Sequence, residues 1–273
     1  MAHHRPVLYD IAIPNARGDA ATMIEVAREA ERLGFRGAWV IDHLLPPRDA
    51  QAYTPILEAL TSLAYLAAAT TRIRLGTSVL VLPLREPVLV AKQAATIDVL
   101  SGGRLVLGVA AGHLEPEFAN LHADFASRGE RTDEAIRLLR HLWSGSPAPF
   151  RGEHYDYRDG VFAPLPLQAR LPLMVGGFSA AALRRAATYG DIWQSDTLGP
   201  DRYRERLAEL RALPGGSGLE VGARGQMPDD PRHVREVVRL WEEAGAQHLA
   251  ISFGRDITAI ARMRAFARAV GLS

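Results

Sequence analysis

Two histidines follow short apolar runs, at the places where parallel strands would end. His43 comes after the run 37–41 and Asp42, and His113 comes shortly after the run 105–109. An imidazole changes its charge near neutral pH, so each histidine suits general acid or base chemistry. A hydrogen-bonded loop histidine with no chemical role is the alternative for both. If the two strands lie in one sheet, His43 and His113 are expected to converge as proton-transfer residues.

The segment Gly176-Gly177-Phe178-Ser179 lies between an apolar run and a segment of helical periodicity. Glycine lets a ligand approach the backbone, and the first turn of a helix offers unpaired N–H groups and a positive dipole end. The segment therefore has the form of a phosphate cradle. The simpler alternative is a turn in which Ser179 only caps the helix. The chain has no P-loop lysine and no GxGxxG fingerprint, which argues against nucleotide hydrolysis and against a Rossmann dinucleotide site.

A third candidate lies in the β-branched run 73–82, which Gly76-Thr77-Ser78 interrupts. A glycine within a strand often marks a bulge or the close approach of a ligand. Close packing of the strand against the helix layer is the alternative. Thr77 and Ser78 are therefore candidate site residues.

The composition excludes several kinds of site and partner. The chain has no cysteine, which excludes disulfides, thiolate metal sites and cysteine nucleophiles. His43, His113 and His122 lack the spacing of a zinc site, so no metal is expected and a metal-dependent hydrolase is disfavoured. The 32 basic and 31 acidic residues are spread along the chain and give a net charge of +1, which argues against nucleic acid as a partner.

No segment has the pattern of a targeting or membrane-spanning sequence. The first ten residues lack the apolar centre of a signal peptide, and no run approaches the ~20 apolar residues of a membrane helix. We therefore expect a cytoplasmic protein with no membrane partner.

Apolar runs alternate with segments of helical periodicity along the 273 residues. The predicted strands are residues 7–13, 37–41, 73–82, 105–109, 173–175, 191–195, 219–224 and 249–253. The predicted helices are residues 20–33, 54–69, 87–101, 129–143, 180–189, 201–212, 231–244 and 257–270. The alternation predicts an α/β fold in which residues 1–273 form a single (β/α)8 TIM barrel. A doubly wound open sheet is the alternative.

Two local features complete this prediction. Thr54 and Pro55 are suited to the N-cap and first position of the second helix. The proline-rich segment 147–170 breaks the alternation and predicts a short hairpin around 154–157 and 161–162, before the fifth strand.

Taken together, these motifs resemble the bacterial luciferase-like flavin and deazaflavin oxidoreductases. The resemblance covers most of the chain up to about residue 195. It runs through GFRGAWVIDH (34–43), TTRIRLGTSVLVLPLREPVLVAKQAATIDVLSGGRLVLGVAAG (70–112), Glu117-Phe118, RGERTDEAIRLLRHLW (128–143), FRGEHYDY (150–157) and PLMVGGFSAAALRRAATYGDIWQ (172–194). Each motif alone is weak, and only the set is specific.

The resemblance implies a TIM barrel that binds a flavin-type ring at its C-terminal mouth. It places the cofactor phosphate on the backbone of 176–179, and a non-proline cis peptide at Ser78-Val79 behind the ring. The pair Asp42-His43 is similar to the subgroup that uses coenzyme F420, a deazaflavin, where a histidine at the position of His43 takes part in the reaction. The residues expected to bind the cofactor are Asp42, Thr77, Ser78, Val79, Gly112, Gly176, Gly177, Phe178 and Ser179, and those expected to be catalytic are His43 and His113.

The implied reaction is hydride transfer between the deazaflavin C5 and a small-molecule substrate. FMN-binding members often carry an arginine before the glycine that ends strand four, whereas Ala111 precedes Gly112 here, which favours F420. In some F420-dependent dehydrogenases a glutamate occupies the position of His113 and acts as a general acid. The alternatives are an FMN-dependent monooxygenase that receives reduced flavin from a separate reductase and uses oxygen, and a non-catalytic flavin-binding protein. The family also implies a homodimer.

Overall fold

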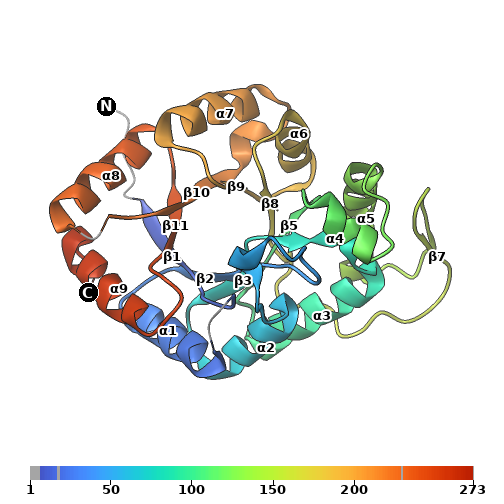
Figure 1. Ribbon diagram of the computed structural model, residues 1–273. Helices are drawn as coiled ribbons and strands as arrows, with labels where there is room; N and C mark the ends of the chain where they lie inside the picture. Colours follow the sequence, from blue (N-terminus) through green and yellow to red (C-terminus); the bar gives the residue numbers. More distant parts are fainter. Residues whose placement is uncertain (1–6, 17–18, 229, 273) are drawn as a thin grey trace.

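The structure is a computed structural model that describes residues 7–16, 19–228 and 230–272. Parallel strands form a closed barrel with helices outside it (Figure 1). The strands are β1 (Leu8–Ala12), β2 (Gly37–Val40), β3 (Arg74–Thr77), β4 (Leu80–Val81), β5 (Leu105–Ala110), β8 (Leu173–Gly176), β9 (Ile192–Ser195), β10 (Glu220–Gln226) and β11 (His248–Ser252). Their order is β3-β2-β1-β11-β10-β9-β8-β5, and pairing of β3 with β5 closes the ring. The predicted (β/α)8 barrel is confirmed.

The third barrel strand consists of two segments, β3 and β4, which both pair with β5. Between them lie Ser78 and Val79, and the peptide bond that joins these two residues is cis. The cis peptide implied by the family resemblance is therefore present. It divides a run that the sequence presents as one continuous strand.

Helices alternate with the strands as expected. They are α1 (Ala20–Arg32), α2 (Ala59–Ala69), α3 (Pro87–Leu100), α4 (Glu115–Asn120), α5 (Arg128–Trp143), α6 (Ala180–Tyr189), α7 (Pro200–Ala212), α8 (Pro231–Glu243) and α9 (Thr258–Val270). The α3 helix starts at Pro87, where a missing N–H costs nothing, and the Glu86 carboxylate accepts from the N–H of Leu89. It ends before Gly102, which adopts the left-handed conformation (φ 71°) of a helix C-terminus. Among the described residues, no helix is long and apolar enough to cross a membrane.

The middle of the barrel is filled by apolar side chains. This interior cluster consists of Trp39, Val106, Met174, Ile192 and Ala250, with Val79 packed against it. A Cβ on Gly76 would lie 2.3 Å from the carbonyl oxygen of Val106 and 2.5 Å from the Trp39 ring. Gly76 is therefore explained by close packing inside the barrel, and neither a ligand nor the helix layer is needed to account for it.

A buried cluster of charged groups lies below this apolar layer, near the amino ends of the strands. The Asp10 carboxylate accepts from Arg36 Nε and Nη2 at 3.0 and 2.8 Å, and its Oδ2 lies 2.9 Å from His248 Nδ1. Arg36 also pairs with Glu220. Burial alone would raise the pKa of Asp10, but the hydrogen bonds from His248 and Arg36 outweigh it and hold that pKa well below its usual range.

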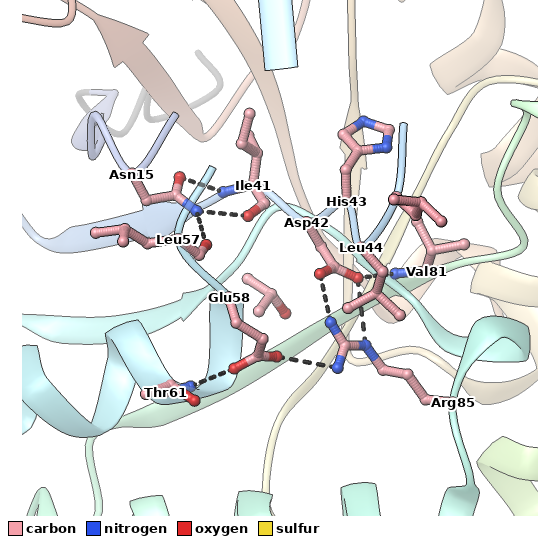
Figure 2. Close-up of polar contacts among 12 residues, drawn as sticks. Asn15, Ile41, Asp42, His43, Leu44, Leu57, Glu58, Thr61, Val81 and Arg85 are labelled. Atoms are coloured by element: carbon pink, nitrogen blue, oxygen red, sulfur yellow. Dashed lines mark hydrogen bonds and ion pairs between the residues drawn. The ribbon is translucent and has the colours of Figure 1, made fainter. Parts of the chain in front are cut away.

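The second helix begins later than predicted. The Thr54-Pro55 peptide is cis, and α2 starts at Ala59, with the Glu58 carboxylate accepting from the N–H of Thr61 (Figure 2). The prediction that Thr54 caps this helix is wrong. The physical reason is a contact with a distant loop, because Asn15 accepts from the N–H of Leu57 and donates to its carbonyl, which keeps this segment extended.

The hairpin before the fifth barrel strand is present, but its pairing differs from the prediction. It pairs β6 (Phe150–Arg151) with β7 (Asp156–Tyr157), and residues 161–162 take no part. The Glu134 carboxylate on α5 accepts from the N–H groups of three consecutive residues, 153–155, and so fixes the turn there. The hairpin projects beyond the ring of helices (Figure 1).

We predict that Gly76→Ala lowers the free energy of unfolding by about 2–3 kcal/mol, because an added methyl group must displace the Trp39 ring or the β5 backbone. The measurement is urea denaturation. Gly218→Ala is the matched control, since a Cβ there meets nothing within 4 Å, and it should change stability by no more than about 0.5 kcal/mol. Equal effects of the two substitutions would contradict this account of the barrel interior.

Candidate active site

His43 lies at the carboxyl end of β2 and is held by two neighbours. Its ring packs against Tyr53 with the centroids 4.1 Å apart, and its Nδ1 lies 2.8 Å from Glu117 Oε2. The ring is only 8% exposed. The orientation of His43 is therefore fixed by packing on one side and by a carboxylate on the other.

Glu117 is fixed in turn by the backbone that follows His43. Its Oε1 accepts from the N–H groups of Leu44 and Leu45 at 2.7 and 3.0 Å. Burial alone would raise the pKa of Glu117, but the hydrogen bonds from His43 and these two N–H groups outweigh it and leave the pKa below its usual value. Glu117 is therefore ionised at neutral pH.

The ionised carboxylate decides which nitrogen of His43 carries the proton. A carboxylate can only accept, so Nδ1 must be the N–H donor. Nε2 of the neutral ring is then an acceptor; it has no hydrogen-bond partner among the described residues, and it is not a buried atom. His43 thus has one free basic nitrogen that solvent can reach.

Asp42 points away from His43 and toward Arg85 (Figure 2). Its Oδ1 accepts from Arg85 Nη2 at 2.5 Å, and its Oδ2 accepts from the N–H of Val81 at 2.9 Å. Arg85 also pairs with Glu58 at 2.9 Å. Both oxygens of Asp42 are thus engaged in holding β4 and the start of α2, and its contact with a cofactor stays a prediction.

Ser78 is held from across the barrel mouth. Its Oγ donates to Gln194 Oε1 on β9 at 2.5 Å, and its carbonyl oxygen accepts from Arg224 Nη1 on β10 at 2.7 Å. The preceding residue, Thr77, is fully buried, and its Oγ1 bonds the backbone of Gly108 on β5. The hydroxyl of Thr77 therefore joins two strands, while Ser78 and Val79 lie at the mouth.

Gly112 and His113 follow β5. Gly112 has φ 81°, and a Cβ there would come within 2.6 Å of Val81 and 2.9 Å of Phe118. His113 is exposed, and its ring centroid lies 6.4 Å from that of His43. The structure therefore brings the two predicted histidines together.

The loop 176–179 joins β8 to α6 as predicted. Gly177 has φ 108°, and the Ser179 hydroxyl caps α6 by accepting from the N–H of Ala182 at 3.2 Å. In the described part of the chain, the N–H groups of residues 178–181 make no hydrogen bond. The loop and the first turn of α6 therefore present four unpaired donors at the positive end of a helix.

Three side chains at the mouth were not assigned a role from the sequence. Glu117 is part of a recognised motif, but its contact with His43 spans 74 residues. Gln194 and Arg224 stand at strand ends, yet nothing in the sequence marks them as partners of Ser78. The sequence signal that could have found them is the alternation of side-chain direction along β9 and β10, which places both side chains inside the barrel.

No metal site accompanies these residues. Across residues 7–16, 19–228 and 230–272, no group of three or more histidine, aspartate or glutamate side chains is arranged to hold a metal ion.

Comparisons with known proteins point to one family. A family model described as luciferase-like monooxygenase matches residues 7–224. An uncharacterised protein of Mycobacterium tuberculosis is 35% identical over 212 residues, which are 72% of this chain and 73% of that protein. The F420-dependent glucose-6-phosphate dehydrogenase of Kineococcus radiotolerans is 33% identical over 235 residues, which are 80% of this chain and 68% of that protein.

The fold is also shared with solved structures. An F420-dependent secondary alcohol dehydrogenase, in complex with an F420-acetone adduct, has a TM-score of 0.81 at 19% identity, over 97% of this chain and 99% of that chain. A monooxygenase from Streptomyces bottropensis has the same TM-score and identity, over 97% of both chains. At this level of identity the similarity establishes the fold alone.

We predict that Glu117→Gln lowers the free energy of unfolding at pH 7 by about 2–3 kcal/mol, because it removes charge-assisted hydrogen bonds. The folded-state pKa of Glu117 is lowered, so its contribution is present above the usual glutamate value of 4.5 and is lost as the pH falls through the folded pKa. The difference between variant and wild type should therefore shrink below about pH 4 in urea titrations. Glu115→Gln, an exposed change on the same helix, is the control; a difference that persisted at low pH would count against an ionised Glu117.

Proposed function

Because the chain belongs to the luciferase-like monooxygenase family, we propose that it is an oxidoreductase that transfers a hydride between coenzyme F420 and a small organic substrate. The observation that carries this proposal is that the Glu117–His43 pair and a loop of unpaired N–H groups both follow the carboxyl ends of barrel strands. The F420-dependent dehydrogenase among the relatives supports the choice of cofactor.

The loop 176–179 fits the phosphate of such a cofactor. Four free N–H donors and the positive end of α6 suit a phosphate group. Gly177 has φ 108°, a conformation that disfavours any larger residue. We assign Gly177, Phe178 and Ser179 to the phosphate.

The segment beside this loop fits the ring. Gly176 leaves room for the Val79 side chain, since a Cβ at Gly176 would lie 2.7 Å from Val79 Cγ1. Ser78, Val79 and Gly112 together form the part of the mouth between β4, β5 and β8, and we assign them to the ring. We assign Thr77 and Asp42 an indirect role, in which they hold β3 and β4 in place.

When bound, the deazaflavin supplies the hydride acceptor or donor at C5. The protein handles the accompanying proton. For oxidation of an alcohol, His43 Nε2 takes the hydroxyl proton as the substrate C–H bond breaks and the carbonyl forms, and the ionised Glu117 stabilises the resulting imidazolium. In the reverse direction His43 returns this proton. The exposed His113 ring, 6.4 Å away, provides a path for the proton to solvent.

An FMN-dependent monooxygenase is the second candidate, and the name of the matching family model favours it. It would need reduced flavin from a separate reductase, and oxygen. Ala111, which stands before Gly112, offers no positive charge to the FMN phosphate. The lack of a positive charge at this position and the free Nε2 of His43 favour F420.

The quaternary structure and location are further proposals. Tyr65 on α2 and Leu89 and Leu100 on α3 are large apolar side chains that are exposed in the single chain. Exposed apolar side chains on two helices that contact each other suit a subunit interface, which supports the proposed homodimer. A single-domain cytoplasmic protein is the accompanying proposal.

Cofactor binding is the first test. We expect the protein to quench F420 fluorescence and to bind F420 more tightly than FMN. Gly177→Ala should weaken F420 binding by roughly tenfold or more, because the loop must rearrange and misplace its N–H donors. Gly102→Ala is the matched control: it puts the same side chain at a positive φ of 71°, in open space at the end of α3. Tighter binding of FMN would favour the monooxygenase.

Catalysis is the second test. With F420 bound, a panel of secondary alcohols and sugar phosphates is screened for reduction of F420 by its loss of absorbance. For an active substrate, His43→Gln should lower kcat by about 10²–10⁴-fold with little change in F420 affinity, and His113→Ala should have a smaller effect. A His43→Gln protein with the kcat of wild type would exclude His43 as the base. Tight F420 binding with no turnover across the panel would favour the non-catalytic alternative.

A further inference from the structure

A positive charge without a carboxylate partner lies inside the barrel mouth. Arg224 on β10 is half buried, and its Nη1 donates to the carbonyl oxygen of Ser78 at 2.7 Å. Within the described part of the chain this is its one hydrogen bond, and no carboxylate comes within ion-pair distance of it. Its Nε and Nη2 are not buried, so a ligand in the mouth can reach them.

Several other partly buried arginines have acidic partners, whereas Arg74 and Arg104 form no ion pair among the described residues. Arg36 meets Asp10, Arg85 meets Asp42, and Arg185 meets Asp133. Partly desolvating a guanidinium without such a partner is unfavourable. Burial lowers the pKa of Arg224, and Asp196 and Tyr53 offset this only as more distant charges, while Arg255 adds to it. Arg224 therefore has both the charge and the free N–H groups to pair with an anion in the mouth.

The free part of the guanidinium has a defined geometry. With Nη1 committed to Ser78, the Nε and Nη2 edge remains, and it presents two parallel N–H groups. In this same chain that edge of Arg36 binds both oxygens of Asp10, at 3.0 and 2.8 Å. A ligand with two coplanar oxygens matches it best.

A second unused donor lies close by. Gln194 on the neighbouring strand accepts from the Ser78 hydroxyl through Oε1, while its buried Nε2 has no partner among the described residues. The two side chains that hold Ser78 thus both keep N–H groups without acceptors. Of the two, Arg224 is the one that a ligand in the mouth can reach, because Gln194 Nε2 is buried.

We propose that Arg224 binds a carboxylate of the substrate through its Nε and Nη2 edge, so that the enzyme acts on small organic acids. The proposal rests on the proposed function for the cofactor and the reaction, and it adds the substrate class. Arg224 lies near Tyr53, which packs on His43, so the anion site and the proposed base open into one mouth.

The test is equilibrium binding of simple anions to the protein, with and without F420. Acetate and glycolate are titrated by ligand-observed NMR, with acetamide as the neutral isostere of acetate and inorganic phosphate as the second anion. Arg224→Met should weaken carboxylate binding by roughly tenfold or more and leave acetamide unchanged. Arg224→Lys keeps the charge and a donor to Ser78 but loses the paired N–H edge, so it should recover only part of the affinity.

Arg158→Met, directly after β7, is the control, because it makes the same change in net charge at an exposed site outside the barrel; it should bind carboxylates as wild type does. Unchanged carboxylate binding in both Arg224 variants, or an equal loss in the control, would overturn the proposal. Phosphate binding that is tighter than carboxylate binding and depends on Arg224 would overturn the assignment to organic acids. Failure of F420 and FMN to bind would instead sink the proposed function, while Arg224-dependent carboxylate binding by the cofactor-free protein would still stand.

Discussion

The mouth of the barrel depends on how Ser78 is held. Its N–H donates to the carbonyl of Val40 at 2.7 Å, its hydroxyl donates to Gln194, and its carbonyl accepts from Arg224. Strands β2, β9 and β10 thus meet at one residue, and the break in the third strand is fixed by the whole barrel. The apolar cluster beneath supports the same place, because Val79 packs onto it. Val79, assigned to the ring, and Arg224, assigned to the anion, take their positions from this arrangement.

The barrel itself could be predicted because its signals are local. Apolar runs, prolines such as Pro87 and glycines such as Gly102 act within a few residues, and they mark most elements to within a residue or two. The errors arose where a distant side chain decides the backbone. Asn15 holds Leu57 extended and delays the second helix, and Glu134 sets the hairpin turn through three N–H groups. The short helix α4 was missed because six residues carry little periodicity.

The candidate site also has features that could be predicted from the sequence and features that could not. His43, His113 and the loop 176–179 could be located because they directly follow apolar runs. The direction of a side chain could not be read from position, and Asp42 illustrates this, since its carboxylate faces Arg85 and not the mouth. Nor could the partnership of Glu117 with His43 be read, because it joins residues 74 apart through a helix that was not expected. The role proposed for Arg224 could not be predicted either. It depends on the lack of a carboxylate partner in the folded chain, and no sequence motif shows such a lack.

The charged cluster at the amino ends of the strands has a consequence for the synthesis of the chain. Asp10 and His248 are 238 residues apart in sequence, yet they are in contact where the first and last strands close the ring. A ribosome that adds about 5–20 residues per second needs on the order of tens of seconds to make the second partner after the first. During that interval β1 has no β11 to pair with, and Asp10 has no histidine. The nascent barrel therefore carries an open seam until almost the last strand has emerged, and its exposed edges must be kept from pairing with other chains for that time.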